Sequence, residues 1–295
     1  MDSTENKLSD KVTLIECPRD AMQGIKEFIP TKDKIAYIDS LLKVGFHRID
    51  VGSFVSPKAI PQMRDSGEVI RSLDLDNTKS KLSVIVANRR GAHNAVEYDE
   101  VDILGYPFSI SETFQKRNTN SSIEESLQRV ADIQAIALKN NKDLLIYISM
   151  AFGNPYGDPW NVEIAIQFVK KLISMGITKF SLSDTIGVSS PESINYLFSN
   201  LIDYFPEVLF NAHLHTTPDK WEEKVESAYK AGCRSFDGAI KGYGGCPMAK
   251  DKLTGNMPME HMVDYFNTKG ISSNIDLENF HTSMDFSGNI FHNAS

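Results

Sequence analysis

The sequence predicts an α/β protein built as one (β/α)8 barrel, the TIM-barrel fold, with extra helices at its C-terminal end. Eight short apolar segments alternate with stretches of helical periodicity along most of the chain, which is the pattern of a parallel barrel. The 295 residues are 41% hydrophobic, enough for one large core. No low-complexity linker divides them. We therefore expect a single domain over residues 1–295, with the barrel over about 12–270 and a C-terminal extension over about 271–295.

Eight segments have the length and the β-branched composition of buried strands. In chain order they are residues 12–17, 48–51, 82–87, 101–104, 144–150, 179–183, 211–215 and 234–237. The competing arrangement is a doubly wound open sheet, which usually carries a glycine-rich phosphate turn after its first strand. Here the first strand runs into a polar turn, Pro18-Arg19-Asp20, so a closed barrel is favoured.

Helix signals occupy the intervals between these strands. Thr31 is the expected N-cap of the first helix, and Gly45 ends it. Ser121 or Ser122 caps the longest helix, which runs to about residue 139 and has two glutamates in its first turn. Further helices are expected at about 63–73, 92–96, 160–175, 191–204 and 220–229, then one or two from about 258 and a mobile tail after 289.

Charge and cysteine content narrow the classes of function. A formal net charge of −8 argues against general binding to nucleic acids or membrane surfaces, and no apolar run is long enough to span a bilayer. The three cysteines, Cys17, Cys233 and Cys246, form no disulfide framework, which is typical of a reducing compartment. The first ten residues carry neither a signal-peptide nor an import pattern, so we expect a cytoplasmic protein.

Two histidines share one side of the seventh strand. His213 and His215 are two residues apart, and strand side chains alternate between faces. Their imidazoles, about 6–7 Å apart along a strand, can bind one ion if the backbone twists them together. The alternative is a pair of histidines bound to carboxylates in a cleft.

Polar residues follow several other strands, and catalytic groups of such barrels lie at the C-terminal ends of strands. These positions are held by Arg19, Asp20, Asp50, Asp184, His213 and His215, with Lys241, Cys246 and Asn256 beyond the eighth strand. The first and eighth strands are neighbours in a closed barrel, so we expect Asp20 near the histidines. Imidazole nitrogens, a carboxylate and an amide oxygen suit Mg²⁺ or Mn²⁺ better than a structural zinc ion, which prefers thiolates.

Simpler interpretations exist for several of these residues. Arg19 and Asp20 could form a turn ion pair, and Asp184 could cap the helix that follows it. Cys17 and Cys233 are expected to be inert core residues. Residues 242–247 are too rich in glycine for a strand or helix. They predict either a surface loop or, as we favour, a lid that carries Cys246 into a closed site.

Seven stretches together identify a relationship: CPRDAMQ, SFVSPKAIPQM, SSIEESLQR, SLSDTIGV, HLH, GGCPMA and TGN. The chain resembles the hydroxymethylglutaryl-CoA lyase family of metal-dependent TIM-barrel lyases and synthases, from about residue 14 to 266. The family cleaves 3-hydroxy-3-methylglutaryl-CoA into acetyl-CoA and acetoacetate. The resemblance therefore implies an acyl-CoA substrate, a Mg²⁺ or Mn²⁺ cofactor and a homodimer.

The resemblance also implies a role for each matching residue. Asp20, His213, His215 and Asn256 would bind the cation. Arg19 would stabilise the enolate oxygen, oriented by Asp50, while Cys246 and Asp184 would handle protons. Gln23, Ser53 and Ser181 would line the acyl pocket, and Lys26 would meet the CoA phosphates.

Two departures from the family pattern stand out. Asp50 replaces the usual glutamate, and Thr216 replaces an aspartate after the second histidine. These changes keep open a related aldolase, synthase or lyase that acts on another hydroxy acid or acyl-CoA. A catalytically dead barrel that serves as a binding protein is a third possibility, which the retained polar residues weigh against.

Overall fold

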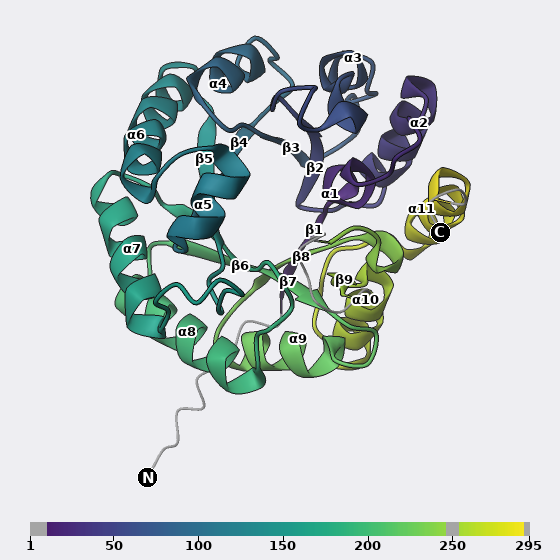
Figure 1. Ribbon diagram of the computed structural model, residues 1–295. Helices are drawn as coiled ribbons and strands as arrows, with labels where there is room; N and C mark the ends of the chain where they lie inside the picture. The colour runs from purple at the N-terminus through teal and green to yellow at the C-terminus, as the bar shows by residue number, and fades with distance from the viewer. Residues whose placement is uncertain (1–10, 246–253, 292–295) are drawn as a thin grey trace.

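The computed structural model describes residues 11–245 and 254–291 and shows eight parallel strands closed into a barrel (Figure 1). The strands are β1 (Thr13–Glu16), β2 (Arg48–Ser53), β3 (Lys81–Ile85), β4 (Ile103–Ser109), β5 (Asp143–Ser149), β6 (Lys179–Asp184), β7 (Leu209–Thr216) and β8 (Ser235–Gly238). Each strand pairs with the next along the chain, and β8 pairs with β1. The predicted (β/α)8 barrel is confirmed.

Helices surround the barrel, and all but the last two lie in the connections between its strands (Figure 1). They are α1 (Pro18–Gln23), α2 (Thr31–Leu42), α3 (Ser66–Arg71), α4 (Arg89–Ala95), α5 (Glu112–Thr119), α6 (Ile123–Lys139), α7 (Val162–Ser174), α8 (Pro191–Tyr204), α9 (Trp221–Lys230), α10 (Met259–Thr268) and α11 (Leu277–Phe291). Short elements complete them: the 3-10 turns η1 (Pro61–Met63) and η2 (Ile240–Gly242), and β9 (Gly255–Asn256). None of the described helices has the combination of length and apolar character needed to cross a membrane.

Several elements differ from the sequence-based expectation. The expected polar turn at residues 18–20 is instead the helix α1, which begins with Pro18 in its first turn, where the fixed φ of proline suits a helix. Helix α5 was not expected, because its polar sequence lacks an apolar stripe. Strand β4 extends to Ser109, beyond the expected end at 104, because Gly105 and Pro107 lower the strand propensity without ending the strand.

The ends of the helices can be compared with the capping and stop residues expected from the sequence. Ser122 caps α6 through a capping box with Glu125, as one of the two expected serines. Gly45 adopts a positive φ of 91° after the end of α2, as expected for a stop signal. The prediction for Thr31 was wrong: Thr31 is already helical, Pro30 precedes it at the cap position, and the Thr31 hydroxyl donates to Asp65.

The core has an apolar layer outside the barrel and a polar layer within it. Ile38 of α2, Val130 of α6 and Leu197 of α8 are fully buried, as expected for helix faces packed on a sheet. Asp50, Ser181 and Asp237 are equally buried, and Ser181 donates to Asp237. Buried charges of this kind are costly unless they are paired, so these residues belong to an organised polar centre.

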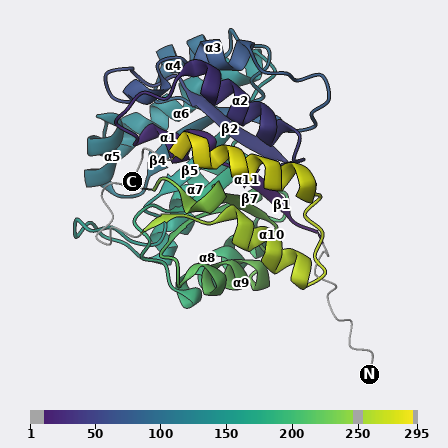
Figure 2. The same cartoon turned by 90° about the vertical axis from the view of Figure 1, so that its right-hand side faces the viewer.

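The last two helices close the side of the barrel next to its N-terminal elements. Helix α11 lies across α2 (Figure 2), and Phe291 at its end is buried. Asn289 is therefore inside this helix, and the expectation of a tail that begins after it was wrong for residues 290 and 291. An apolar helical face continues to Phe291, which the sequence-based limit did not recognise.

Candidate active site

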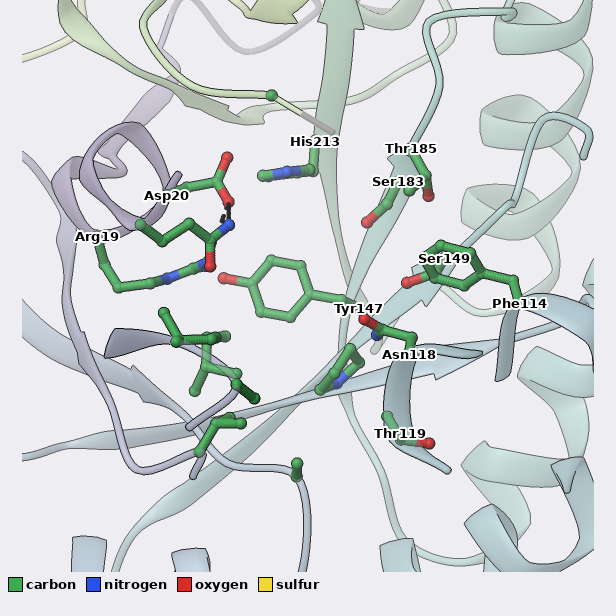
Figure 3. Close-up of a pocket in the computed structure, with 18 of the residues that line it drawn as sticks. Arg19, Asp20, Phe114, Asn118, Thr119, Tyr147, Ser149, Ser183, Thr185 and His213 are labelled. Carbon is green, nitrogen blue, oxygen red and sulfur yellow. Dashed lines mark hydrogen bonds and ion pairs between the residues drawn. The ribbon is translucent and has the colours of Figure 1, made fainter. Parts of the chain in front are cut away.

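A cavity of about 390 Å³ opens among the C-terminal ends of the strands. In Figure 3, Arg19, Asp20 and His213 lie on one side of it, and Phe114 and Asn118 lie on the other. The apolar part of the lining includes Val55, Ile60, Ile85 and Phe114. The cavity thus combines a charged end with an apolar wall, as expected of a site for an amphipathic small molecule.

Helix α1 supplies the acidic group at the charged end. Asp20 is buried and accepts hydrogen bonds from Arg19 Nη1 (3.0 Å), Gln23 Nε2 (2.6 Å) and Asn256 Nδ2 (2.8 Å). Burial alone would raise the pKa of Asp20, but the charges of Arg19 and His213 outweigh it and the net pKa lies below the ordinary value. Asp20 is therefore an ionised carboxylate inside the cavity, ready to bind a cation.

Strand β7 brings the two histidines together as expected. Their ring centroids are 5.3 Å apart, and ligand atoms of Asp20, His213 and His215 all lie within 4.8 Å of one another. His215 Nδ1 is 3.0 Å from the Thr185 carbonyl oxygen, which can only accept, so Nδ1 carries the proton. His215 Nε2 is buried and has no hydrogen-bond partner, which fits a nitrogen that binds a metal ion.

Asn256 joins this group from a distant part of the sequence. Strand β9 pairs antiparallel with β7, and Asn256 of β9 lies opposite His215 of β7. Asn256 Nδ2 donates to Asp20 Oδ2 and to the Tyr243 carbonyl oxygen. Both amide hydrogens are used, so Oδ1 is the atom that would bind a cation. The four residues expected to hold the metal are therefore brought together.

Arg19 is held by a buried carboxylate on β2. Asp50 is fully buried, and its Oδ2 accepts from Arg19 Nε at 2.9 Å and Nη2 at 2.5 Å. Burial raises the pKa of Asp50, and Arg19 offsets part of that rise. An aspartate thus reaches Arg19 directly, and the guanidinium stays fixed at the edge of the cavity.

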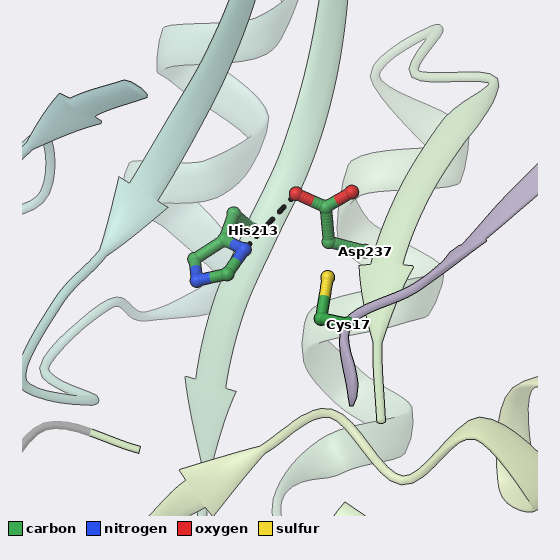
Figure 4. Close-up of side chains that lie close together, drawn as sticks. All are labelled: Cys17, His213 and Asp237. Carbon is green, nitrogen blue, oxygen red and sulfur yellow. Dashed lines mark hydrogen bonds and ion pairs between the residues drawn. The ribbon is translucent and has the colours of Figure 1, made fainter. Parts of the chain in front are cut away.

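Asp237, which was not among the residues expected in the site, supports His213 from near the end of β8. Asp237 Oδ2 lies 3.0 Å from His213 Nδ1 (Figure 4), while Oδ1 accepts from Arg48 Nη2 at 2.9 Å. Burial alone would lower the pKa of His213, but the hydrogen bond to Asp237 outweighs it and raises that pKa. The strand-end rule that selected the other residues would have selected Asp237 too.

Cys17 lies beside this pair and completes a second group of potential ligand atoms (Figure 4). Burial raises the pKa of the Cys17 thiol well above its usual range, and burial raises that of Cys233 to about 12. Both thiols stay protonated at neutral pH. These contacts agree with the expectation of inert core cysteines.

Asp184 has contacts that favour structural support. Its carboxylate accepts from Val188 N (2.8 Å), from Ser189 N (3.0 Å) and Oγ (2.5 Å), and from Lys224 Nζ (2.7 Å). Lys224 is also buried, and it donates to the His215 carbonyl oxygen at 2.8 Å. Asp184 is not part of the cavity lining among the described residues, and its proton-transfer role stays a prediction.

The other expected substrate residues are divided between the cavity and its surroundings. Gln23 lines the cavity. Ser53 Oγ accepts from Val55 N and lies in a neighbouring groove, and Ser181 contacts Asp237 in the barrel interior. Lys26 is exposed after α1. Cys246 lies outside the described residues.

Comparison with known proteins assigns the chain to a family. The family model described as HMGL-like matches residues 11–286. The chain is 34% identical over 269 residues to the hydroxymethylglutaryl-CoA lyase of Bacillus subtilis, covering 91% of this chain and 89% of that protein.

Solved structures agree with this result. The HMG-CoA lyase of Bacillus subtilis superposes with a TM-score of 0.90 at 31% identity, over 96% of this chain and 94% of that one. An HMG-CoA lyase from Acinetobacter baumannii, in complex with coenzyme A and 3-methylmalate, has a TM-score of 0.89 at 29% identity, over 99% of this chain and 93% of that one.

Proposed function

The chain belongs to the HMGL-like family, and we propose that it is a metal-dependent carbon–carbon lyase that cleaves 3-hydroxy-3-methylglutaryl-CoA to acetyl-CoA and acetoacetate. The observation that carries the proposal is the meeting of Arg19, Asp20, His213 and His215 in one cavity. An ionised carboxylate, two imidazoles and a buried guanidinium are the groups that this reaction requires.

The proposed metal ligands are Asp20, His213, His215 and Asn256, and the proposed ion is Mg²⁺ or Mn²⁺. When bound, the ion would polarise the substrate hydroxyl and orient the substrate. Asp237 fixes the ring of His213, and the Thr185 carbonyl fixes that of His215. Such supporting contacts typically change metal affinity or activity by about 10–100-fold.

Arg19 is the proposed electrostatic catalyst. Carbon–carbon cleavage leaves the electron pair on the acetyl-CoA fragment as an enolate, whose oxygen needs a fixed positive partner. Asp50 and Asp20 hold the guanidinium from two sides, so Arg19 needs no reorganisation when the charge develops. Loss of one such donor typically costs about 10²–10³ in rate.

One residue is proposed to transfer a proton directly, and a second is proposed to position the site. Cys246 is proposed to deliver a proton to the enolate carbon, from the chain segment that follows Gly245. Asp184 was proposed with it, but four donor atoms already bind the Asp184 carboxylate. These contacts favour a positioning role for Asp184, in which it holds Lys224 and thereby the backbone of His215.

The acyl-CoA substrate is proposed to enter across the open end of the cavity. Gln23 would contact the acyl group, and the exposed Lys26 would meet the CoA phosphates. The coenzyme A complex of the Acinetobacter baumannii lyase supports this class of ligand. We also propose a homodimer, a single domain and a cytoplasmic location, the last supported by the free cysteines Cys17 and Cys233.

A related lyase, aldolase or synthase acting on another hydroxy acid or acyl-CoA is the second candidate function. It is favoured by Asp50, whose side chain is one methylene shorter than the glutamate usual in the family. Purified protein loaded with Mg²⁺ or Mn²⁺ should form acetoacetate from 3-hydroxy-3-methylglutaryl-CoA in a coupled assay, at one ion per chain. Bound metal with no acetoacetate would favour the second candidate, and absence of both would favour a binding protein.

A further inference from the structure

We infer that the C-terminal helix α11 is a positioning element of the metal-binding site, acting from Phe291 through Tyr243 to Asn256. The inference rests on the proposed metal-binding function. It concerns a helix that lies on the outside of the barrel, against α2 (Figure 2).

Phe291 forms the outer part of this connection. Its ring stacks on Tyr243, with centroids 4.2 Å apart and planes 19° from parallel. Its edge contact with Tyr37 of α2 has a centroid separation of 6.0 Å. Phe291 and Tyr37 are both buried. The ring of Tyr243 is thus held against a wall made by two helices.

Tyr243 belongs to a short segment, residues 241–245, which we call the glycine stem. Lys241 adopts a positive φ of 58°, which is uncommon for a residue with a side chain. Two carboxylates hold the backbone where the stem begins: the buried Glu16 accepts from Ile240 N, just before the stem, at 2.9 Å, and the half-buried Glu260 accepts from Lys241 N at 2.8 Å. The backbone at the start of the stem is therefore held by two carboxylates.

The glycine stem contacts the metal-binding residues directly. The Tyr243 carbonyl oxygen accepts from Asn256 Nδ2 at 2.7 Å, which leaves the amide oxygen as the metal-binding atom. A Cβ on Gly244 would lie 2.7 Å from the Asp20 carbonyl oxygen and 2.8 Å from Asn256 Nδ2. The stem thus packs against two of the four proposed ligands with no space for a side chain at Gly244.

These contacts give α11 a specific effect on the site. If the Phe291 ring is removed, Tyr243 loses its stacking partner and its carbonyl can shift. Asn256 then keeps only its bond to Asp20, and its amide can rotate away from the orientation that presents Oδ1. Metal affinity should fall even though none of the four ligands has changed.

The test measures Mn²⁺ affinity and apo-protein melting temperature in Phe291→Ala and in a matched variant, Phe280→Ala. Phe280 lies on the same helix and is buried to a similar extent, but its ring contacts are with Phe46 and with its neighbour His281, neither of which belongs to the glycine stem. Both variants should lower Tm by similar amounts. Phe291→Ala should raise the Mn²⁺ Kd about 10–100-fold, the range for supporting contacts, while Phe280→Ala should leave it within about twofold. Phe291→Tyr, which keeps the ring, should restore affinity.

Equal changes of Kd in the two alanine variants, or no change in Phe291→Ala, would overturn the inference. If Phe291→Ala does not fold, Tyr243→Ala is measured in its place. An unchanged Mn²⁺ Kd in Tyr243→Ala would likewise overturn the inference. Failure of the wild-type protein to bind Mn²⁺ would instead reject the proposed metal site, and the inference with it.

Discussion

Asp50→Glu tests how Arg19 is positioned. Asp50 is fully buried, and one of its oxygens already accepts two hydrogen bonds from Arg19. Glutamate would add one carbon–carbon bond, about 1.5 Å, in a space that is already filled. Inserting a methylene into a packed interior typically costs about 1–3 kcal/mol, and the guanidinium is the group that must move.

The expected result is a fall in kcat/KM for 3-hydroxy-3-methylglutaryl-CoA. Each 1.36 kcal/mol corresponds to about tenfold in rate, so the cost above translates into about 5–150-fold. Complete loss of Arg19 as a donor sets an upper limit of about 10³. The fall should be mainly in kcat, since Arg19 acts on charge that develops in the transition state.

The assay is acetoacetate formation under saturating metal, with Asp50→Asn as a variant of the same size that removes the charge. Thermal melting of each variant separates loss of folding from loss of positioning. Higher activity of Asp50→Glu than wild type would show that the pocket has changed toward another acyl group. Unchanged activity in both variants would show that Asp50 does not position Arg19.

Variants of His215, Cys246, Lys224 and Asp158 test other parts of the site and its support. His215→Ala should strongly weaken metal binding while the barrel stays folded; unchanged affinity and stoichiometry by calorimetry would reject His215 as a ligand. Cys246→Ser should lower kcat by about 10²–10⁴-fold, the range for a general acid, with little change in KM, and normal kcat would exclude proton donation. Lys224→Met should destabilise the fold by about 3–5 kcal/mol, because it leaves the buried Asp184 carboxylate without its cation, and denaturant titration should show partial recovery when Asp184→Asn is added. Asp158→Asn should raise KM, because Asp158 holds the start of α5 at the cavity. Hydrogen bonds lower the pKa of Asp158, so its stabilising effect is present above the ordinary carboxyl range and is lost as pH falls through the lowered pKa. Below about pH 4 the melting temperature should therefore fall more steeply in wild type than in Asp158→Asn, since the other carboxylates titrate in both proteins.

Local sequence patterns were enough to predict the barrel and to select most of the proposed metal ligands. Alternation along a strand places His213 and His215 on one side whatever surrounds them. The strand-end rule then selects Asp20 and Asp50 without any knowledge of contacts. These signals are local or follow from closure of the barrel, so they can be recognised in the sequence alone.

Tertiary structure decided which of these residues share the cavity. Asp184 satisfies the same strand-end pattern as Asp20, and the family resemblance adds Ser181, yet their polar atoms are taken up by Lys224 and by Asp237. The sequence pattern shows which face of the strand a side chain is on. Its position along the barrel axis, and therefore its hydrogen-bond partners, depend on strand register and tilt.

The proposed link from α11 to the proposed metal-binding residues could not be predicted from the sequence. Phe291 carries the helical periodicity of an ordinary packed residue, and nothing near it indicates Tyr243 or Asn256. Asn256 and Asp20, which share a hydrogen bond, are separated by 236 positions. Contacts over such separations form only when the chain closes the barrel and lays β9 on β7, so folding, and not local residue preference, builds this part of the site.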